Sequence, residues 1–465
     1  MLESTNRPAE EDVETEIERS GGGSVLFNPN VLCGDRSALE ARGQEGERGA
    51  IIIMVGTKAS GRGGQRKRIR TQASATAKAQ SVSPMKGGRY EADLRLATEA
   101  VRLASKLCRA SQLQLRENEN TNQTKRDKLE SPVTVADLGA QAIVSWALQN
   151  LPNSGAVTRN DGFSLVAEED SDFLRSEEGA DLRNRVVDLV NNTLKGSGLK
   201  ELTEAEVLLA IDEGRSEGGS DRRHWVLDPI DGTRGFVGNR QYAIALALLD
   251  EGEPVLGVLG CPNLSLEAED LDARTAAATS SSESSSSSQQ EDGSGYLFVA
   301  EKRRGAYKVG IEIEAGSSGS DAESGTPGDI LGHRISVDEV DPNDAVYMES
   351  VETKHSDHAF ARKVAENSGI NKDSLKLDSQ VKYGVIASGK ASAFMRFPDL
   401  DYKEWIWDHA AGAIIMEEAG GVVTDSEGKK LDFSKGRTLN NGNGIVAAPP
   451  KLHRKLIESI KALGR

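Results

Sequence analysis

The segment Trp225–Phe236, WVLDPIDGTRGF, carries two carboxylates, Asp228 and Asp231, where an apolar run meets a Gly-Thr turn. The apolar run predicts the end of a buried strand, and Pro229 and Gly232 interrupt it, so both carboxylates are expected at the turn. Carboxylate oxygens suit Mg²⁺, which proteins usually hold with one or two carboxylates and the phosphate oxygens of a substrate. Two such acids are also common at turns and helix caps that bind no metal.

The residues after Asp231, Gly232-Thr233-Arg234-Gly235, predict that a short helix begins at the turn. The first backbone N–H groups of a helix have no partner within it, and the helix dipole places positive charge at the same end. An anion such as a phosphate is favoured there. The whole segment therefore predicts a site where a hard cation and a phosphate lie side by side.

Four further segments share this character and follow in a set order along the chain. They are residues 131–137 (SPVTVAD), 165–170 (LVAEED), 378–383 (DSQVKY) and 406–412 (IWDHAAG). Together with the first segment they resemble the inositol-monophosphatase-like metal-dependent phosphatases. The last two resemble most closely the branch of 3'(2'),5'-bisphosphate nucleotidases, which hydrolyse 3'-phosphoadenosine 5'-phosphate. The resemblance extends over about residues 90 to 462, apart from two insertions.

The resemblance implies a metal site built from four carboxylates and one backbone carbonyl. The implied ligands of Mg²⁺ are Glu168, Asp228, Asp231, Asp408 and the carbonyl of Ile230, while Asp137 and Thr233 would activate the attacking water. Two cations ~3.5–4 Å apart can hold the nucleophile and the leaving group of a phosphoryl transfer. Without cations, crowded carboxylates raise one another's pKa. Taken singly, Asp137 also fits the polar face of an Ala-rich helix, and residues 168–170 fit a solvated acidic strand end.

The resemblance further implies a pocket for a nucleotide with two phosphates. It places His355, Ser379, Lys382 and Arg396 around the adenosine and the 5'-phosphate, and Gly232, Thr233 and Asp408 beside the 3'-phosphate that is cleaved. A phosphate that is bound but not hydrolysed needs cations such as Lys382 and Arg396. Both also fit ordinary strand-edge positions. His355 and His358, three apart on an expected helix, lack the further ligands of a transition-metal site and favour a solvated or stacking role.

A few positions depart from the family pattern. Arg234 stands where the family usually has Lys, and residues 237–240 (VGNR) replace an Arg-Gly-Gly-like loop. Trp405 precedes Ile406-Trp407-Asp408, where the family generally carries Lys. None of these residues is an implied metal ligand, so the differences bear on substrate preference more than on chemistry.

Composition excludes several other classes of protein. The formal net charge is −16, which argues against general nucleic-acid binding, because a binder of the phosphate backbone needs a basic face. The three cysteines, Cys33, Cys108 and Cys261, form no C-x-x-C pair and no disulfide framework. No run of about 18 apolar residues predicts a membrane span. We expect a monomer.

Residues 1–89 are expected to form a disordered extension. Met1–Ser20 holds seven acidic residues and two arginines, and residues 54–90 carry nine Lys or Arg and no acid. The basic stretch 54–89 is typical of an organellar transit peptide, although it does not begin the chain. A start at Met54, or at Met85 for a cytosolic form, would account for its position. The prediction is a chloroplast or mitochondrial protein; a basic disordered tail on a cytoplasmic protein is the alternative.

Residues 90–465 are expected to form one catalytic domain. Apolar residues at helical spacing from Leu94 to Leu107 predict a first helix, and a second runs from Val135 towards Leu151. Strands are expected at 243–249, 255–259 and 296–300, a helix is expected to begin at Asp408, and another is expected over 451–463. Residues 267–295 and 315–329 are low-complexity insertions, since they hold too few apolar residues to offset their ordering entropy. The resemblance implies an α/β layered fold, the αβαβα sandwich of the inositol monophosphatase and fructose bisphosphatase type.

The expected reaction is Mg²⁺-dependent hydrolysis of the 3'-phosphate of 3'-phosphoadenosine 5'-phosphate to AMP and phosphate. The sulfated relative, 3'-phosphoadenylyl sulfate, is an expected second substrate, and the resemblance implies inhibition by Li⁺. An inositol polyphosphate 1-phosphatase or inositol monophosphatase with the same metal site is the first alternative. A non-catalytic nucleotide sensor is an alternative of another class.

Overall fold

The computed structural model describes residues 13–18, 24–27, 52–57, 88–120, 132–152, 162–266, 295–311, 332–351, 356–399, 401–439 and 444–465. The chain divides into two compact units, Met1–Gln80 and Ser81–Arg465. The first unit contains an antiparallel sheet in the order β2-β1-β3, formed by β1 (Val13–Glu18), β2 (Ser24–Phe27) and β3 (Ile52–Thr57). Strand β1 lies in Met1–Ser20, for which composition predicts no ordered element. The expected insertions, 267–295 and 315–329, lie outside the described residues except for Gly295, and the predicted domain limits stay predictions.

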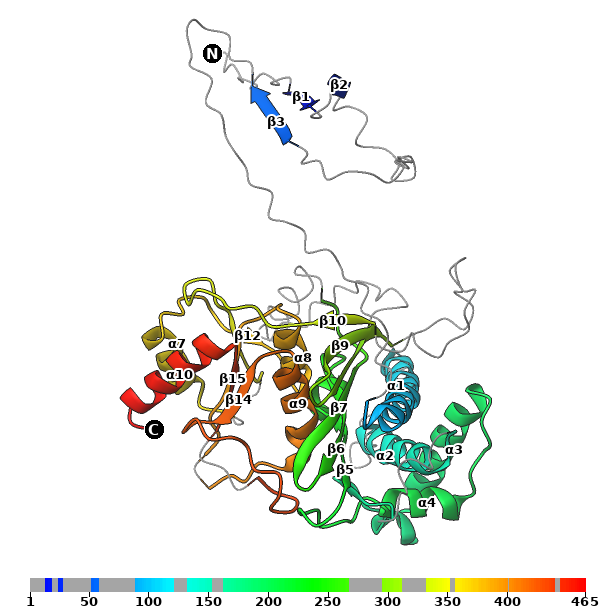
Figure 1. The fold of residues 1–465 in the computed structure, drawn as a ribbon. Helices are drawn as coiled ribbons and strands as arrows, with labels where there is room; N and C mark the ends of the chain where they lie inside the picture. The colour runs from blue at the N-terminus through cyan, green and yellow to red at the C-terminus, as the bar shows by residue number, and fades with distance from the viewer. Residues whose placement is uncertain are drawn as a thin grey trace, which may run out of the picture. The chain divides into compact units, whose positions relative to one another are not determined.

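The second unit contains a seven-stranded sheet in the order β10-β9-β8-β7-β6-β5-β4 (Figure 1). Its strands are β4 (Leu165–Ala167), β5 (His224–Asp231), β6 (Ala243–Asp250), β7 (Glu253–Cys261), β8 (Tyr296–Glu301), β9 (Gly305–Gly310) and β10 (His333–Ile335). Strands β4 and β5 are parallel, and every other neighbouring pair is antiparallel. The three expected strands in this region are confirmed as β6, β7 and β8.

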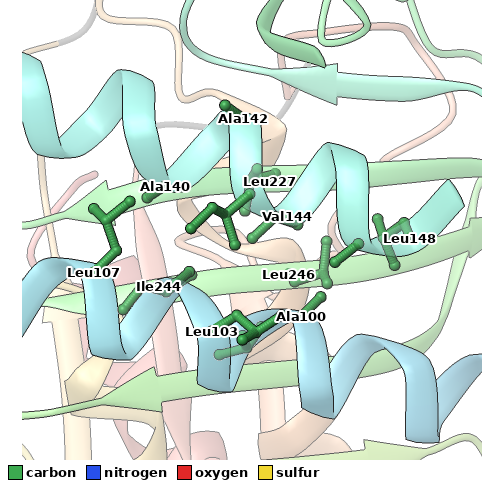
Figure 2. Packing of buried hydrophobic residues seen from close by; sticks show 14 of the residues in the cluster. Ala100, Leu103, Leu107, Ala140, Ala142, Val144, Leu148, Leu227, Ile244 and Leu246 are labelled. Atoms are coloured by element: carbon green, nitrogen blue, oxygen red, sulfur yellow. The ribbon is translucent and has the colours of Figure 1, made fainter. Parts of the chain in front are cut away.

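Two long helices, α1 (Glu91–Asn120) and α2 (Pro132–Asn150), cover one face of this sheet. Figure 2 shows how the buried side chains of α1, α2, β5 and β6 meet there. They include Ala100, Leu103, Leu107, Ala140, Val144, Leu148, Leu227, Ile244 and Leu246. Alanine and leucine alternate across the interface, so the two helices approach the sheet closely, and both expected helices are confirmed.

Strand β6 explains how one sheet supports a layer on each face. Its even-numbered residues from Ile244 to Leu248 are large and pack under α1 and α2. Its odd-numbered residues from Ala243 to Ala247 are alanines that face the opposite core. Small side chains on that second face leave room for the helix that follows Asp408.

A second sheet has the order β12-β11-β13-β15-β14. Its strands are β11 (Tyr347–Glu349), β12 (Leu375–Lys376), β13 (Ala393–Arg396), β14 (Val422–Asp425) and β15 (Ile445–Ala448). Helices α8 (Val381–Ala387) and α9 (Ala410–Glu418) pack between the two sheets, and α7 (His358–Asn367) and α10 (Pro450–Ala462) cover the far face (Figure 1). The layers follow the order helix, sheet, helix, sheet, helix, which confirms the αβαβα sandwich.

The remaining elements lie at the edges of these layers. They are η3 (Phe173–Arg175), α3 (Ala180–Gly196), α4 (Glu204–Asp212), α5 (Thr233–Val237) and η6 (Ile406–Asp408). Among the helices that the structure describes, none is long and apolar enough to cross a membrane.

The structure corrects three local predictions. Strand β5 does not end before Pro229 but continues to Asp231, with a register shift between Asp228 and Asp231. A bulge of this kind tolerates a proline, since the residue need not donate to the ladder. Asp408 does not begin the long helix but ends the 3-10 turn η6 just before it. Helix α7 begins at His358, so it does not include His355.

Candidate active site

A cavity of about 320 Å³ lies where β5, α5, α8, β13 and η6 meet. Its lining includes seven residues that the sequence assigns to metal, catalysis or substrate: Asp231, Gly232, Thr233, Ser379, Lys382, Arg396 and Asp408. They come from both sheets and from positions nearly 180 residues apart. His355, the remaining residue assigned to the substrate, lies outside the described residues.

The bulge in β5 gives its two aspartates different surroundings. Asp228 is only 3% exposed, and its Oδ1 has no hydrogen-bond partner in the described part of the chain. Asp231 lines the cavity and accepts a hydrogen bond of 2.6 Å from the Gln380 backbone N–H. A buried carboxylate oxygen without a donor is unfavourable unless a cation or a proton neutralises it. Asp228 therefore fits a metal ligand.

Helix α5 follows the bulge at once. Gly232 occupies the position before it with φ 91°, a left-handed conformation that glycine adopts at little cost. Thr233 is the first helical residue, and its hydroxyl donates to the Ile230 carbonyl at 3.4 Å. The implied carbonyl ligand and the implied water-orienting hydroxyl are therefore neighbours.

Helix α2 brings Asp137 to the end of strand β4. Asp137 is 6% exposed. Four residues later on the same helix face, Gln141 donates to the Glu169 carbonyl at 2.7 Å and accepts from the Glu169 N–H at 3.0 Å. Gln141 thus fixes the acidic segment after β4, and with it Glu168, beside Asp137. The side chain of Glu168 is the most exposed of the four implied carboxylate ligands.

Burial and mutual repulsion raise the pKa of the acids on this side of the site. Burial, then the charges of Glu169 and Glu168, raises the pKa of Asp137 well above its ordinary value. Burial, then Glu169 and Asp231, raises the pKa of Glu168 to about 7, although its outer surface meets solvent. The pKa of Asp228 is raised by burial and then by Glu168. Three carboxyl groups from three elements therefore lie within electrostatic reach of one another.

The two carboxylates that line the cavity belong to the same cluster. Burial, then the charge of Asp231, raises the pKa of Asp408 well above its ordinary value. Burial also raises the pKa of Asp231, although Lys382 and the Gln380 N–H lower it. Such a group of acids, brought together by folding, is an unfavourable arrangement that bound cations neutralise.

A tighter set of possible ligand atoms lies at the other side of Asp408. Among the described residues, Glu404, Asp408 and His409 form the one set of three whose ligand atoms all lie within 4.8 Å of one another. Glu404, however, accepts from Arg396 Nε at 2.7 Å and pairs with His409 Nε2 at 3.3 Å. Burial raises the pKa of Glu404, but the bonds with His409 and Arg396 outweigh it and hold the pKa at about 2. Glu404 therefore orients Arg396 and His409, and Asp408 is left to face the other carboxylates.

Helix α8 is joined to the metal side through Gln380. Its side-chain amide donates to the Trp407 carbonyl at 2.7 Å and accepts from the Gly412 N–H at 3.0 Å. Its backbone N–H binds Asp231. The preceding residue, Ser379, has φ 66°, a left-handed conformation that is uncommon outside glycine and often marks a functional turn. Gln380 thus connects Asp231 with the turn that carries Asp408.

Two basic residues also line the cavity. The Lys382 ammonium is buried, donates to the Leu377 carbonyl at 3.0 Å and lies 5.0 Å from the centre of the Phe394 ring. Burial lowers its pKa to about 8, while Asp231 and Asp378 raise it. Arg396 is held by Glu404 and lies 5.5 Å from the ring of Tyr402. The sequence predicts both cations, and the structure places them in one cavity with Asp231 and Asp408.

Sequence reasoning missed the residues that hold this arrangement together: Gln141, Gln380, Glu404 and Arg437. They act mainly on backbone groups or on other side chains of the site. Gln141 had a detectable signal, because it is a polar residue four positions after Asp137 in an otherwise apolar helix. Gln380, Glu404 and Arg437 had no detectable sequence signal, since their partners lie in other segments.

A model of the inositol monophosphatase family matches residues 90–465. The chain belongs to this family. The match contains every residue of the cavity and both sheets of the sandwich. Members of the family are metal-dependent, and the carboxyl cluster around Asp228 suits that requirement.

Several curated members of the inositol monophosphatase family align with most of the chain. A protein of Oryza sativa named 3'(2'),5'-bisphosphate nucleotidase is 42% identical over 385 residues, covering 82% of this chain and 96% of its own length. The Arabidopsis thaliana 3',5'-bisphosphate nucleotidase AHL is 40% identical over 387 residues, with coverage of 80% and 96%. A 3'(2'),5'-bisphosphate nucleotidase of Schizosaccharomyces pombe is 35% identical over 384 residues, with coverage of 80% and 96%.

Solved structures of the family are more distant. An inositol monophosphatase from Zymomonas mobilis aligns with a TM-score of 0.46 and 18% identity, covering 81% of this chain and all of the other. CysQ from Bacteroides thetaiotaomicron aligns with a TM-score of 0.45 and 18% identity, covering 77% and 98%.

Proposed function

We propose that this protein is a Mg²⁺-dependent 3'(2'),5'-bisphosphate nucleotidase. It removes the 3'-phosphate of 3'-phosphoadenosine 5'-phosphate to give AMP and phosphate, and it acts in the same way on the sulfated relative. The observation that carries the proposal is the cavity in which Asp231 and Asp408 face two basic residues, Lys382 and Arg396. The aligned bisphosphate nucleotidases of plants and fission yeast support it.

We assign the metal to Glu168, Asp228, Asp231, Asp408 and the Ile230 carbonyl, of which Asp231 and Asp408 line the cavity. All of these atoms are oxygens, which suits Mg²⁺ better than a transition metal. When bound, such cations lower the pKa of a water molecule and neutralise charge on the leaving oxygen. The orphaned Oδ1 of Asp228 supports this ligand set.

Two side chains, those of Asp137 and Thr233, act on the attacking water. Asp137, whose pKa burial and two glutamates raise, accepts the proton of the attacking water. The Thr233 hydroxyl, fixed by the Ile230 carbonyl, orients that water. The first turn of α5 places backbone N–H groups at the start of a helix, where they suit the phosphate that is cleaved.

Substrate preference depends on the second phosphate. Lys382 and Arg396 lie in the cavity wall, where an anion that is not hydrolysed meets two cations. Inositol monophosphates offer no such anion. A substrate with two phosphates therefore gains binding energy that a monophosphate lacks.

This preference is tested by comparing two substrates that differ in one phosphate. We expect Lys382→Met to lower kcat/KM for 3'-phosphoadenosine 5'-phosphate by about 10- to 100-fold, the usual worth of a charged hydrogen bond. It leaves kcat/KM for adenosine 3'-monophosphate near the parent value. Lys390→Met, at an exposed lysine after α8, is the matched control. Phosphate release is measured with and without Mg²⁺.

Two outcomes contradict the proposal. Inositol 1-phosphate or inositol 1,4-bisphosphate hydrolysed much faster than the nucleotides would identify an inositol phosphatase. Nucleotide binding without phosphate release, unchanged in Asp137→Asn, would identify a non-catalytic sensor.

A further inference from the structure

Two of the implied metal ligands are carried by segments that share no sheet. Glu168 follows β4, the edge strand of the seven-stranded sheet, while Asp408 ends η6, which follows β13 of the other sheet. A two-metal site needs both at a fixed separation, because its geometry tolerates little displacement. A structural element must therefore connect the two segments.

Arg437 contacts both of them. Its Nη2 donates to the Ala167 carbonyl at 2.6 Å, directly before Glu168. Its Nη1 donates to the carbonyls of Gly214 and Ser216 at 3.2 and 3.0 Å, in the loop that pairs with β4. One planar guanidinium thus binds three carbonyls around the acidic strand end, which an ammonium group cannot do in the same geometry.

The same residue holds the turn that carries Asp408. The Arg437 carbonyl accepts from the Ile406 N–H at 3.0 Å, at the first residue of η6. The Arg437 guanidinium also lies 4.9 Å from the centre of the Trp407 ring. Trp407 directly precedes Asp408, so Arg437 fixes the residue before each of the two ligands.

Trp405 completes this arrangement. Its ring stacks on that of Trp407 with 4.8 Å between ring centres and an angle of 5° between ring planes. Trp405 is 40% exposed, and its backbone forms a bridge with Thr438, next to Arg437. Trp407 therefore contacts an aromatic ring from Trp405 and a guanidinium from Arg437.

We propose that Arg437, supported by the stacked pair Trp405 and Trp407, is a positioning residue that sets the separation of Glu168 and Asp408 and thereby the affinity for the metal. The inference rests on the proposed function only in assuming that these two acids share a metal site. Arg437 is not among the residues that line the cavity. It acts through the two backbone segments that bear the ligands.

The test measures metal binding without substrate on the full chain. Free Mn²⁺, an ion with the same preference for oxygen ligands, is followed by electron paramagnetic resonance. We expect Arg437→Lys to raise the dissociation constant by about 10- to 100-fold, as loss of support around a metal ligand usually does. Arg454→Lys, an exposed arginine on α10, is the matched control and leaves the constant unchanged. A mere loss of folded protein lowers the number of ions bound per chain and leaves the constant of the remaining molecules as it was.

Trp405 supplies a variant that keeps the test valid if Arg437→Lys does not fold. Because Trp405 is exposed, its replacement leaves the core intact. We expect Trp405→Lys, which restores the usual family residue, to raise the Mn²⁺ dissociation constant by about 2- to 10-fold through loss of the stack. Trp405→Phe keeps an aromatic ring and stays near the parent value.

The outcomes separate this inference from the proposed function. Folded Arg437→Lys or Trp405→Lys protein that binds Mn²⁺ as tightly as the parent overturns the positioning role, whatever the enzyme hydrolyses. A parent protein that binds Mn²⁺ but releases no phosphate from nucleotides overturns the function and leaves the positioning role standing.

Discussion

Folding raises the pKa of single carboxyl groups in this site. The pKa of Glu168 is about 7 in the folded chain, because burial and then Glu169 and Asp231 disfavour its charge, against about 4.5 for an ordinary glutamate. A raised acid pKa contributes stability that is complete below about 4.5 and is lost as pH rises through about 7. Without metal, this group therefore makes the folded state less stable as pH rises across that window. A bound cation removes the penalty.

The first prediction concerns the rise in Tm that Mg²⁺ produces. We expect this rise to grow between about pH 6 and about pH 8, because metal replaces a proton at Glu168 and at the neighbouring acids. Differential scanning calorimetry with and without Mg²⁺ measures it. Glu168→Gln removes the group and flattens the dependence. A Tm difference that shrinks with rising pH would show that the raised pKa of Glu168 plays no part in binding.

The sequence predicts the individual acids better than the residues that hold them. Asp228 and Asp231 stand in a segment whose local pattern indicates a turn with carboxylates, and motif similarity indicates Asp408. Gln380 and Arg437 have no such pattern, since their hydrogen-bond partners lie in other segments of the chain. Arg437 and Ala167, for example, are 270 positions apart. The residues assigned to the substrate are predicted only in part. Motif similarity indicates Lys382 and Arg396, but it does not indicate the contact of Arg396 with Glu404.

Among the elements, α9 depends most directly on close packing. It lies on β7 at Gly257, where an added Cβ would come 2.7 Å from the Ala411 carbonyl oxygen and would also meet Ile414. The carbonyl belongs to the helix backbone, so it cannot move away as a flexible side chain does. Any displacement of α9 also shifts the turn that carries Asp408.

The second prediction follows from this contact. We expect Gly257→Ala to lower the free energy of unfolding by ~1–3 kcal/mol through overpacking and to weaken Mn²⁺ binding. Gly196→Ala is the matched control, because an added Cβ at the end of α3 meets no atom within 4 Å. Its effect stays within about 1 kcal/mol. Urea denaturation measures both, and equal effects of the two substitutions would contradict the close packing.

Long apolar or periodic elements are the ones that the sequence predicts well. Strands β6 and β7 form continuous apolar runs, and α10 begins at a pair of prolines. The two-residue β12 and the three-residue β11 are too short to give a period. The passage of β5 through Pro229 is also unpredictable, because it depends on the register of its neighbour β6. Pairing across a sheet is a tertiary property that local pattern does not contain.

At the scale of the whole molecule, the chain consists of two units of unequal size. Tyr90, directly before helix α1, binds to the seven-stranded sheet of the larger unit. Its N–H donates to Glu301 at 3.1 Å, and its hydroxyl donates to Asp250 at 2.6 Å. Every described residue of the cavity belongs to Ser81–Arg465.

The third prediction is that a chain beginning at Ser81 keeps the activity of the full chain. We expect kcat/KM within about twofold, since truncation is tolerated where no buried contact is lost. Deletion of a further twelve residues removes Tyr90 and Glu91 and lowers Tm. Full loss of activity on removal of residues 1–80 would show that the first unit contributes to the site.

We also propose that residues 54–89 direct the protein to a chloroplast or a mitochondrion. The absence of acids and the nine basic residues of this region support the proposal. The test is the location of a fluorescent protein that is fused to residues 54–89. The control is the same fusion with its basic residues changed to Gln. Cytoplasmic fluorescence of both fusions would favour the alternative.

The bond between Arg437 and Ala167 also bears on synthesis of the polypeptide. The acidic segment after β4 is synthesised early. Arg437, which donates to the Ala167 carbonyl at the end of this strand, is translated 270 residues later. A nascent chain that has not reached Arg437 therefore lacks this hydrogen bond to the acidic segment. By the positioning role that we propose for Arg437, a translation product that ends before this residue keeps Glu168 but binds the metal more weakly.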